Sequence, residues 1–204
     1  MTERPWSLIG ADLARARSAG LDDAGVLHAI LQASLFGHLN RIADAVDVPA
    51  DYPDTFGAPH VEPATPAYLA PGPAEVPDPR APQPIALASR AGAVDLLAGW
   101  RAHALDRDAA PLTRRARAVI AHAVAVRLGD LSVEPAPPES ELDHALVELA
   151  DVVTLAPWRL GPAAYERIRA AGLPDDAQVF DAVATASSCT VFSRIAASLA
   201  ALAR

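Results

Sequence analysis

Apolar residues recur at steps of three and four between Asp23 and Asp47, which is the spacing of one face of an α-helix. These residues are Leu27, Leu31, Leu35, Leu39, Ile42 and Val46. The pattern predicts a long helix whose leucine-rich face is buried against another element. A shorter helical stretch precedes it and ends at Gly20, which is a typical C-cap residue.

The end of the chain repeats the order of features found at its start. Pro5-Trp6-Ser7-Leu8 and Ala19-Gly20-Leu21 correspond to Pro157-Trp158-Arg159-Leu160 and Ala171-Gly172-Leu173. At a shift of 152 positions the identical residues are Pro5, Trp6, Leu8, Ala11, Arg15, Arg17, Ala19, Gly20 and Leu21. After a one-residue insertion near Pro174 the shift is 153, and the identical residues are Asp23, Ala24, Val26, Ala29, Ala33, Ser34, Arg41, Ile42 and Ala43. Landmarks repeated in the same order predict an internal duplication, with a second copy at about 157–203.

Between the two copies lies a proline-rich stretch. Residues 49–84 hold eleven of the nineteen prolines of the chain, too many for helix interiors or for a sheet. We expect an extended connector, which is either a solvated linker or a strap that packs on the surface or reaches a neighbouring subunit.

Three further helices are predicted after the connector. They run from Arg90 to about Arg107, from Thr113 to Leu128, and from about Ser140 to Val153. The predicted organisation is an N-terminal helical hairpin (1–48), the connector (49–84) and a helical body (85–204) that contains the second copy.

Composition supports an all-α fold and limits the partners. Hydrophobic residues make up 51% of the chain and aromatic residues only 5%, which favours closely packed helices. A formal net charge of −8 argues against sequence-independent binding of nucleic acid. Charged residues interrupt the apolar runs before the roughly 20 residues that span a bilayer. No signal segment opens the chain, and Cys189 is its only cysteine, so we expect a cytoplasmic protein without membrane association.

Two segments point to one family. The segment from Leu112 to Ala125 resembles the helix before the redox site in the alkylhydroperoxidase D-like (AhpD-like) and carboxymuconolactone decarboxylase superfamily. The stretch 148–184 is similar to the closing segment of its peroxidase-related members, whose last helix carries Phe-Asn-x-x-Asn-Arg-x-Ala-Asp. Residues 36–44, Phe-Gly-His-Leu-Asn-Arg-Ile-Ala-Asp, keep much of that pattern. The resemblance implies an AhpD-like helical bundle and a tendency to form homo-oligomers.

The chemistry that the resemblance implies lacks its residues here. Family members use a C-x-x-C pair, a histidine beyond it and a glutamate on the preceding helix to reduce peroxides through a disulfide. The corresponding positions hold Asp130, Val133, Pro137 and Ala118. The stretch between Gly129 and Ser140 is also shorter than the helical insertion of the family, so the resemblance implies a scaffold without its dithiol site.

The remaining candidates for chemistry are His122, His38, Asn40 and Cys189. His122 is the best candidate for a proton carrier in a pocket, although a hydrogen-bonded core or interface histidine is the simpler interpretation. Cys189 aligns with Phe36 of the first copy, which predicts a buried small hydrophobe rather than a peroxidatic thiol. The six histidines show no ligand spacing along one helix, so neither a metal nor another cofactor is expected.

The arginines are interpreted structurally. Arg41 and Arg194 are equivalent in the two copies, and we expect them to join helices by binding a carboxylate or helix-end carbonyls rather than a substrate. Asp44 is a possible partner of Arg41. The three arginines of residues 114–117 stand in the first turns of their helix, where positive charge opposes the helix dipole. We expect them to form a solvated helix end or an interface patch.

Three functional hypotheses follow. The leading one is a catalytically degenerate alkylhydroperoxidase-like protein that self-associates as a scaffold or binds a small molecule, without dithiol peroxidase activity. The second is an enzyme of the same superfamily with cysteine-independent acid–base chemistry at His122, His38 and Asn40. The third is an antioxidant peroxidase that depends on Cys189 and an external thiol. The sequence decides neither the substrate nor the oligomer number.

Overall fold

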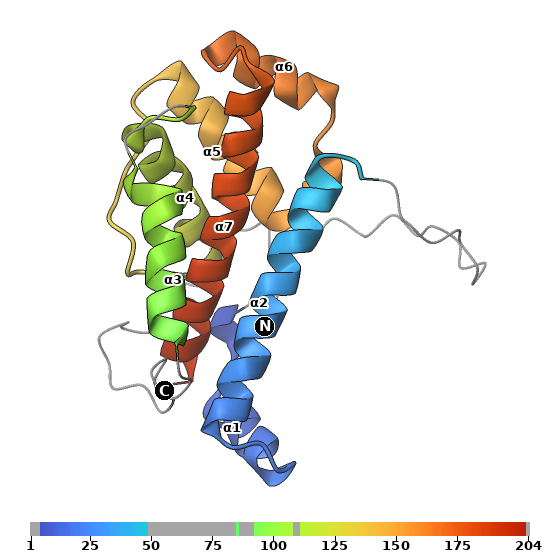
Figure 1. Cartoon of the computed structure of the whole chain (residues 1–204), viewed down its shortest axis with the longest axis vertical. Helices are drawn as coiled ribbons and strands as arrows, with labels where there is room; N and C mark the ends of the chain where they lie inside the picture. Colours follow the sequence, from blue (N-terminus) through green and yellow to red (C-terminus); the bar gives the residue numbers. More distant parts are fainter. Residues whose placement is uncertain (1–4, 49–84, 86–91, 108–110, 203–204) are drawn as a thin grey trace, which may run out of the picture.

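The computed structural model describes residues 5–48, 85, 92–107 and 111–202 (Figure 1). These residues form seven α-helices and no β-strand, which confirms the predicted all-α fold. The helices are α1 (Gly10–Ser18), α2 (Asp23–Ala45), α3 (Ala93–Arg101), α4 (Arg114–Leu128), α5 (Glu141–Leu155), α6 (Pro162–Ala171) and α7 (Asp176–Ala201). Short 3₁₀ segments η1 (Pro5–Ser7) and η5 (Pro157–Arg159) and a π-helical segment η4 (Ala102–Asp106) complete them. The predicted connector at 49–84 lies outside the described residues.

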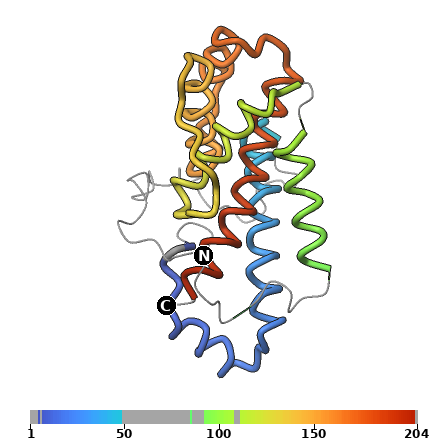
Figure 2. The backbone as a smooth tube through the Cα atoms, turned by 90° about the vertical axis from the view of Figure 1, so that its left-hand side faces the viewer, coloured from blue at the N-terminus to red at the C-terminus, as the bar shows by residue number. Residues whose placement is uncertain are grey.

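Helix α7 runs through the middle of the fold and packs against α2, α4 and α5 (Figures 1 and 2). More than half of its residues are alanine, serine, threonine or cysteine, so neighbouring helices can approach it closely from several sides. Among the helices of the described residues, α7 alone is long and apolar enough to cross a membrane. Within the fold, 89% of its most apolar stretch is buried, as in a core helix.

Two apolar clusters flank α7. One lies between α4, α5 and the first half of α7, where Ile120, Leu146 and Val183 are buried together. The other joins the second half of α7 to the N-terminal hairpin, where Leu27 packs with Phe192. The hairpin therefore shares a core with the C-terminal body.

Helix α2 packs on α7 through a different face from the one that its leucine spacing predicts. The buried positions in its second half are Ser34, Gly37 and Ala45, whose small size allows α7 to approach closely. Leu39 of the predicted buried face is 52% exposed, and Leu35 and Val46 are exposed as well. The prediction is confirmed for Leu27 in the first half of the helix and wrong for the second half.

Arg117 corrects the expectation of a solvated arginine cluster at the start of α4. Its side chain is fully buried and forms an ion pair with Asp181 of α7. The guanidinium also donates to Thr185 Oγ1 at 3.0 Å and to the carbonyl oxygen of Ala104 at 3.1 Å. Because its partners lie on α7 and η4, this arginine joins three elements in the interior. Neighbouring Arg115 is exposed, as expected.

Arg41 joins α2 to α5 through a carbonyl group, as expected, whereas the bond described for Arg194 lies within its own helix. Arg41 donates to the carbonyl oxygen of Thr154 near the end of α5, over 3.2 Å, and to that of Gly37, over 2.7 Å. Arg194 is buried and donates to the carbonyl oxygen of Thr190 at 3.3 Å. Gly37 and Thr190 each stand four residues before their arginine, so the equivalent arginines make the same bond within their own helices.

The bounds of the elements follow the shifts seen in the sequence. Helices α1 and α6 begin at Gly10 and Pro162, which are 152 positions apart, and α2 and α7 begin at Asp23 and Asp176, which are 153 apart. An ion pair recurs as well, because Arg17 binds Asp23 and the equivalent Arg169 binds Asp176, each with an N–O distance of 2.6 Å. The duplication itself stays an inference.

Candidate functional site

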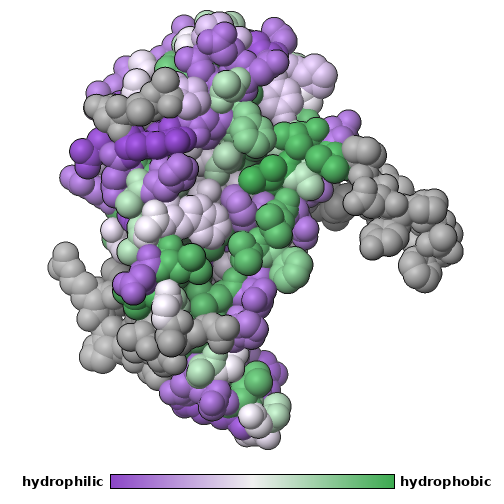
Figure 3. Space-filling view, viewed as in Figure 1, coloured by the Kyte–Doolittle hydropathy of each residue, from purple (hydrophilic) through white to green (hydrophobic). Residues whose placement is uncertain are grey.

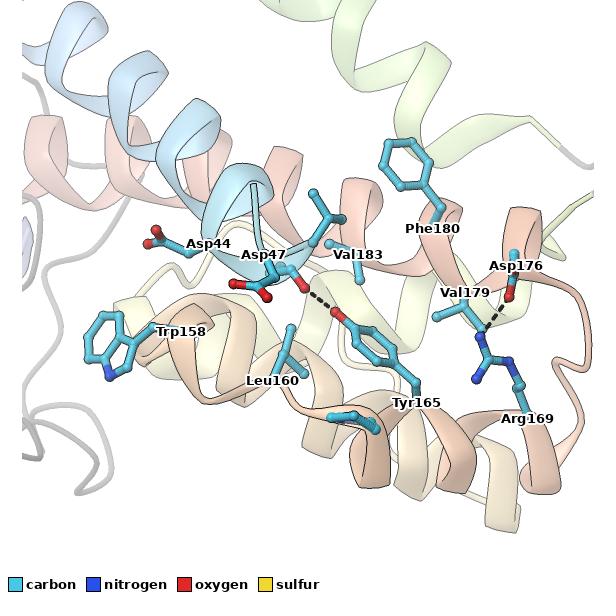
Figure 4. A pocket seen from close by; sticks show the side chains of 13 residues that line it. Asp44, Asp47, Trp158, Leu160, Tyr165, Arg169, Asp176, Val179, Phe180 and Val183 are labelled. Carbon is cyan, nitrogen blue, oxygen red and sulfur yellow. Dashed lines mark hydrogen bonds and ion pairs between the residues drawn. The ribbon is translucent and has the colours of Figure 1, made fainter. Parts of the chain in front are cut away.

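A cleft of about 540 Å³ opens where the end of α2 meets η5, α6 and the first turns of α7 (Figure 4). Its wall combines three aspartates and one arginine with aromatic and aliphatic side chains. The lining residues are Asp44, Ala45, Val46, Asp47, Trp158, Leu160, Pro162, Tyr165, Arg169, Asp176, Val179, Phe180 and Val183. Its volume falls in the range of roughly 300–1,000 Å³ that small-molecule sites occupy.

The end of α2 places two carboxylates in this wall. Asp47 adopts a left-handed backbone conformation (φ 53°), and the N–H of Val48 donates to the carbonyl oxygen of Ala43 at 3.0 Å. This geometry ends the helix, and aspartate tolerates it better than most residues other than glycine and asparagine. Asp44 lies one turn earlier. Burial raises the pKa of the Asp44 carboxyl above its usual value, and the charge of Arg41 opposes that shift.

Tyr165 ties α6 to the end of α2. Its hydroxyl donates to the carbonyl oxygen of Ala45, one of the groups that a helix leaves unpaired at its C-terminus (Figure 4). Burial raises the pKa of Tyr165, with a smaller raising effect from Asp47 and an opposing effect from Arg169. The phenol therefore stays protonated at neutral pH and acts as a donor.

Arg169 is engaged by two carboxylates. It donates to Asp176 Oδ1 at 2.6 Å and to Glu166 Oε1 at 2.7 Å. The hydrogen bond with Asp176 is the main cause that raises its pKa. Asp176 is the first residue of α7, so the pair also places a carboxylate at the positive end of that helix.

Two aromatic side chains of the wall reach the surface. Trp158 is 38% exposed and Phe180 is 51% exposed, while Val179 and Val183 of the same wall are buried. In the view of Figure 4, Asp44 and Trp158 lie at one end of the cleft and Arg169 and Asp176 at the other. The cleft therefore has polar groups at both ends, and Leu160, Val183 and the ring of Tyr165 lie between them.

Cys189 lies in the core cluster of α4, α5 and α7 with 2% of its surface exposed. Burial raises the pKa of its thiol to about 12. A thiol in that environment stays protonated and out of reach of peroxide, which agrees with the expected buried small hydrophobe.

His38 is a structural link between α2 and α7. The hydroxyl of Ser187 donates to the carbonyl oxygen of His38 at 3.0 Å, and its oxygen lies 2.9 Å from His38 Nδ1. Ser187 is fully buried, so these contacts lie in the interior between the two helices.

The predicted candidates are not brought together in the cleft. His122 lies half-buried on α4, Asn40 is exposed on α2, and Cys189 is on α7. The cleft described above has none of the four candidates in its wall, nor do two smaller clefts of about 270 and 210 Å³. The positions that correspond to the dithiol site are also structural. Asp130, for example, accepts hydrogen bonds from the backbone N–H and hydroxyl of Ser132 at 2.9 and 2.6 Å.

Sequence reasoning missed the residues that form the cleft. In the sequence Trp158 is only a landmark of the repeat, and Asp44 is only the end of the 36–44 motif and a possible partner of Arg41. Tyr165 and Asp47 belong to no recognised sequence motif. The one usable signal was the position of Trp158, a large aromatic residue in a proline-containing segment between two helices, where exposed aromatics often serve binding.

Comparison with known proteins adds no relative. No protein-family model matches the chain, and no curated protein or solved structure matches it significantly. Among the described residues, no group of three or more histidine, cysteine, aspartate or glutamate side chains is arranged to hold a metal ion.

Proposed function

We propose that this protein binds a small organic molecule in the cleft between α2, α6 and α7. The observation that carries the proposal is the cleft itself, whose wall combines apolar side chains with aromatic residues and several polar groups. This is the usual composition of a small-molecule site.

A fragment screen by ligand-observed NMR tests this proposal, with a variant that fills the cleft. Val46 lines the cleft and is 41% exposed, so Val46→Trp adds bulk there without disturbing the core. We expect fragments that bind wild type to lose at least tenfold in affinity for Val46→Trp. Val126→Trp, at an exposed position of α4 outside the cleft, serves as the control and should bind normally. Binding that ignores Val46→Trp, or no binding in the whole screen, would overturn the proposal.

The same proposal includes the absence of dithiol peroxidase activity. It takes the chain as a degenerate member of the alkylhydroperoxidase-like superfamily that keeps a helical scaffold. Its support is the motif resemblance together with the burial and raised pKa of Cys189. Peroxide consumption with a dithiol reductant should equal the uncatalysed rate in both wild type and Cys189→Ser. Turnover in wild type that Cys189→Ser abolishes would favour the antioxidant peroxidase instead.

Self-association is a second candidate function, and a patch on α2 favours it. Leu35, Phe36 and Leu39, here called the α2 stripe, are all exposed, and Phe36 is 60% exposed. Figure 3 shows apolar side chains gathered along the outward side of this helix. At a shift of 153 the stripe corresponds to Ser188, Cys189 and Phe192 of α7, which are buried under neighbouring helices. The stripe thus keeps apolar residues at positions that helices cover in the other copy.

Sedimentation measurements test self-association. Phe36→Glu together with Leu39→Glu should convert an oligomer to a monomer, because charge on the stripe opposes its burial. Leu131→Glu, at a 59% exposed position outside α2, is the control and should leave the oligomer intact. A wild-type monomer at 100 μM would sink this second candidate and leave the cleft proposal untouched.

A further inference from the structure

We infer that the cleft takes a monovalent organic cation, an amine or quaternary ammonium group attached to an aromatic or branched apolar body. The inference rests on the proposed function, since it names the class of ligand for the same cleft. It is carried by the distribution of charge and aromatic rings in the wall.

The wall carries a net negative charge. It contains Asp44, Asp47 and Asp176 against the single cation Arg169, which leaves a formal charge of −2. Asp176 and Arg169 bind each other at 2.6 Å. The excess therefore resides on Asp44 and Asp47, at the end of α2.

The backbone adds to this charge. Helix α2 ends at Ala45, so the negative end of its dipole lies at this end of the cleft. The positive ends of α6 and α7 also reach the wall, at Pro162 and Asp176. At α7 the positive end of the helix is compensated by Asp176 in the first turn and by the side chain of Asp175 at the N-cap. The carboxylates of Asp44 and Asp47 and the negative end of the α2 dipole therefore lie together in this part of the cleft.

An anionic ligand would find no available cation in the wall. Arg169 already binds Glu166 and Asp176, with N–O distances of 2.7 and 2.6 Å, so an anion would have to displace a carboxylate. The hydroxyl of Tyr165 is used as well, because it donates to the carbonyl oxygen of Ala45.

The aromatic and aliphatic lining fits the rest of such a ligand. Trp158 lies at the same end of the cleft as Asp44 in Figure 4. An indole face attracts an ammonium group, by about 0.5–2 kcal/mol depending on how well the pair is desolvated. Leu160 and Val183 continue the wall as an apolar surface. A cation beside the aspartates would therefore leave its apolar part over these side chains.

The carboxylate of Asp44 should interact favourably with a ligand cation. Burial raises the pKa of its carboxyl, and the charge of Arg41 opposes this effect. Arg41 itself is bound to the carbonyl oxygens of Thr154 and Gly37. A ligand cation would stabilise the ionised form of Asp44.

Three probes of the same shape test the class of ligand: 2-phenylethylammonium, 2-phenylethanol and 3-phenylpropanoate. Their dissociation constants are measured by NMR titration at pH 7.5 and low salt. We expect the ammonium probe to bind at least fivefold more tightly than the alcohol, and the carboxylate more weakly than both. The preference for the ammonium probe should shrink in 0.5 M NaCl, because this part of the cleft is open to solvent.

Removal of the two carboxylates isolates the charge effect. In Asp44→Asn with Asp47→Asn, the ammonium probe should bind no more tightly than the alcohol, and the alcohol should bind as it does to wild type. Glu134→Gln with Glu141→Gln changes the net charge by the same amount at exposed positions outside the cleft wall, and should keep the preference.

The outcomes separate this inference from the proposed function. Equal binding of the alcohol and the ammonium probe to wild type, or tightest binding of the carboxylate, would overturn the cationic class. In that case Val46→Trp would still abolish binding, and the cleft would stand as a site. Binding of all three probes that Val46→Trp does not change would overturn both. If none of the probes binds, the aromatic amine class is wrong, and the fragment screen alone decides the cleft.

Discussion

Arg117 and Asp181 form an ion pair in the interior of the fold, between α4 and α7. The guanidinium is fully buried, and Asp181 also accepts a hydrogen bond from Arg107 at 2.9 Å. A carboxylate held by two arginines joins α4, η4 and the central helix. This network is a polar contact between the central helix and elements that precede it.

Loss of the buried arginine should destabilise the protein strongly. Arg117→Met leaves Asp181 without its buried partner, and breaking a buried pair costs about 3–5 kcal/mol. We expect a value near the lower end because Asp181 is partly exposed and keeps Arg107. The free energy of unfolding in urea measures the loss. Arg167→Met is the control, since Arg167 meets Glu148 on the surface at 3.7 Å, and it should change stability by less than about 1 kcal/mol. A loss of that small size for Arg117→Met as well would contradict the assignment of a buried pair.

The link between His38 and α7 predicts a stability change in weak acid. Burial lowers the pKa of His38 below 6.5, with Arg41 adding to the effect and a hydrogen bond with Ser187 opposing it. The unfolded chain therefore takes up a proton at a higher pH than the folded protein does. Stability is fully present above the unfolded pKa and is lost as pH falls below about 6.5 towards the folded value.

Urea unfolding at pH 7.5 and pH 5.5 measures this change. His38→Gln should remove part of the difference between the two pH values, while the exposed His144→Gln should leave it intact. Equal pH dependence in wild type and His38→Gln would show that the imidazole of His38 is not the group that titrates.

The helices were accessible from sequence because their ends carry local signals. Gly20 and Gly172 both adopt positive φ after a helix, and Thr113 and Ser140 cap the helices that follow them. Each of these residues acts on the backbone within a few positions of itself. Periodicity and capping chemistry therefore predict where helices begin and end.

The packing face of α2 could not be predicted from hydrophobic spacing. Close approach of two helices favours small residues, and Ser34, Gly37 and Ala45 carry little weight in a hydrophobic pattern. The apolar residues of the α2 stripe are larger, so the pattern assigned them to the interior. Which face is covered is decided by α7, far away in the sequence.

The same distance in sequence hid the cleft and the buried ion pair. Asp44, Trp158 and Val179 come from three separate segments, and no local pattern in these segments shows that they meet. Arg117 is 64 positions from Asp181. The local sequence shows that a residue is charged. Only the packing of the helices shows whether that residue is buried together with a partner of opposite charge.

Cys189 should resist modification in the folded protein. Its thiol is buried and its pKa is raised to about 12, so little thiolate exists at neutral pH. We expect a thiol reagent to react stoichiometrically in 6 M guanidinium chloride and at least a hundredfold more slowly under native conditions. Because the folded pKa lies above the value of about 9 for a free thiol, stability should fall as pH rises beyond 9, and Cys189→Ala should weaken that fall. Rapid native reaction at pH 7.5 would contradict the buried assignment.

Replacement of Asp47 by glycine should change the stability of the protein and its ligand binding in opposite directions. Its backbone is left-handed at φ 53°, a conformation that glycine adopts without strain, so Asp47→Gly should stabilise the protein by up to about 1 kcal/mol. The same change removes a carboxylate from the cleft and should weaken binding of 2-phenylethylammonium at least twofold. Asp47→Asn keeps a side chain that tolerates this conformation but loses the charge, so it should weaken binding similarly with little change in unfolding free energy. Thermal unfolding and NMR titration of the two variants separate the effects. If Asp47→Gly and Asp47→Asn both bind the ammonium probe as tightly as wild type, Asp47 is only the residue that ends α2, and Asp44 alone would have to supply the charge of the cleft.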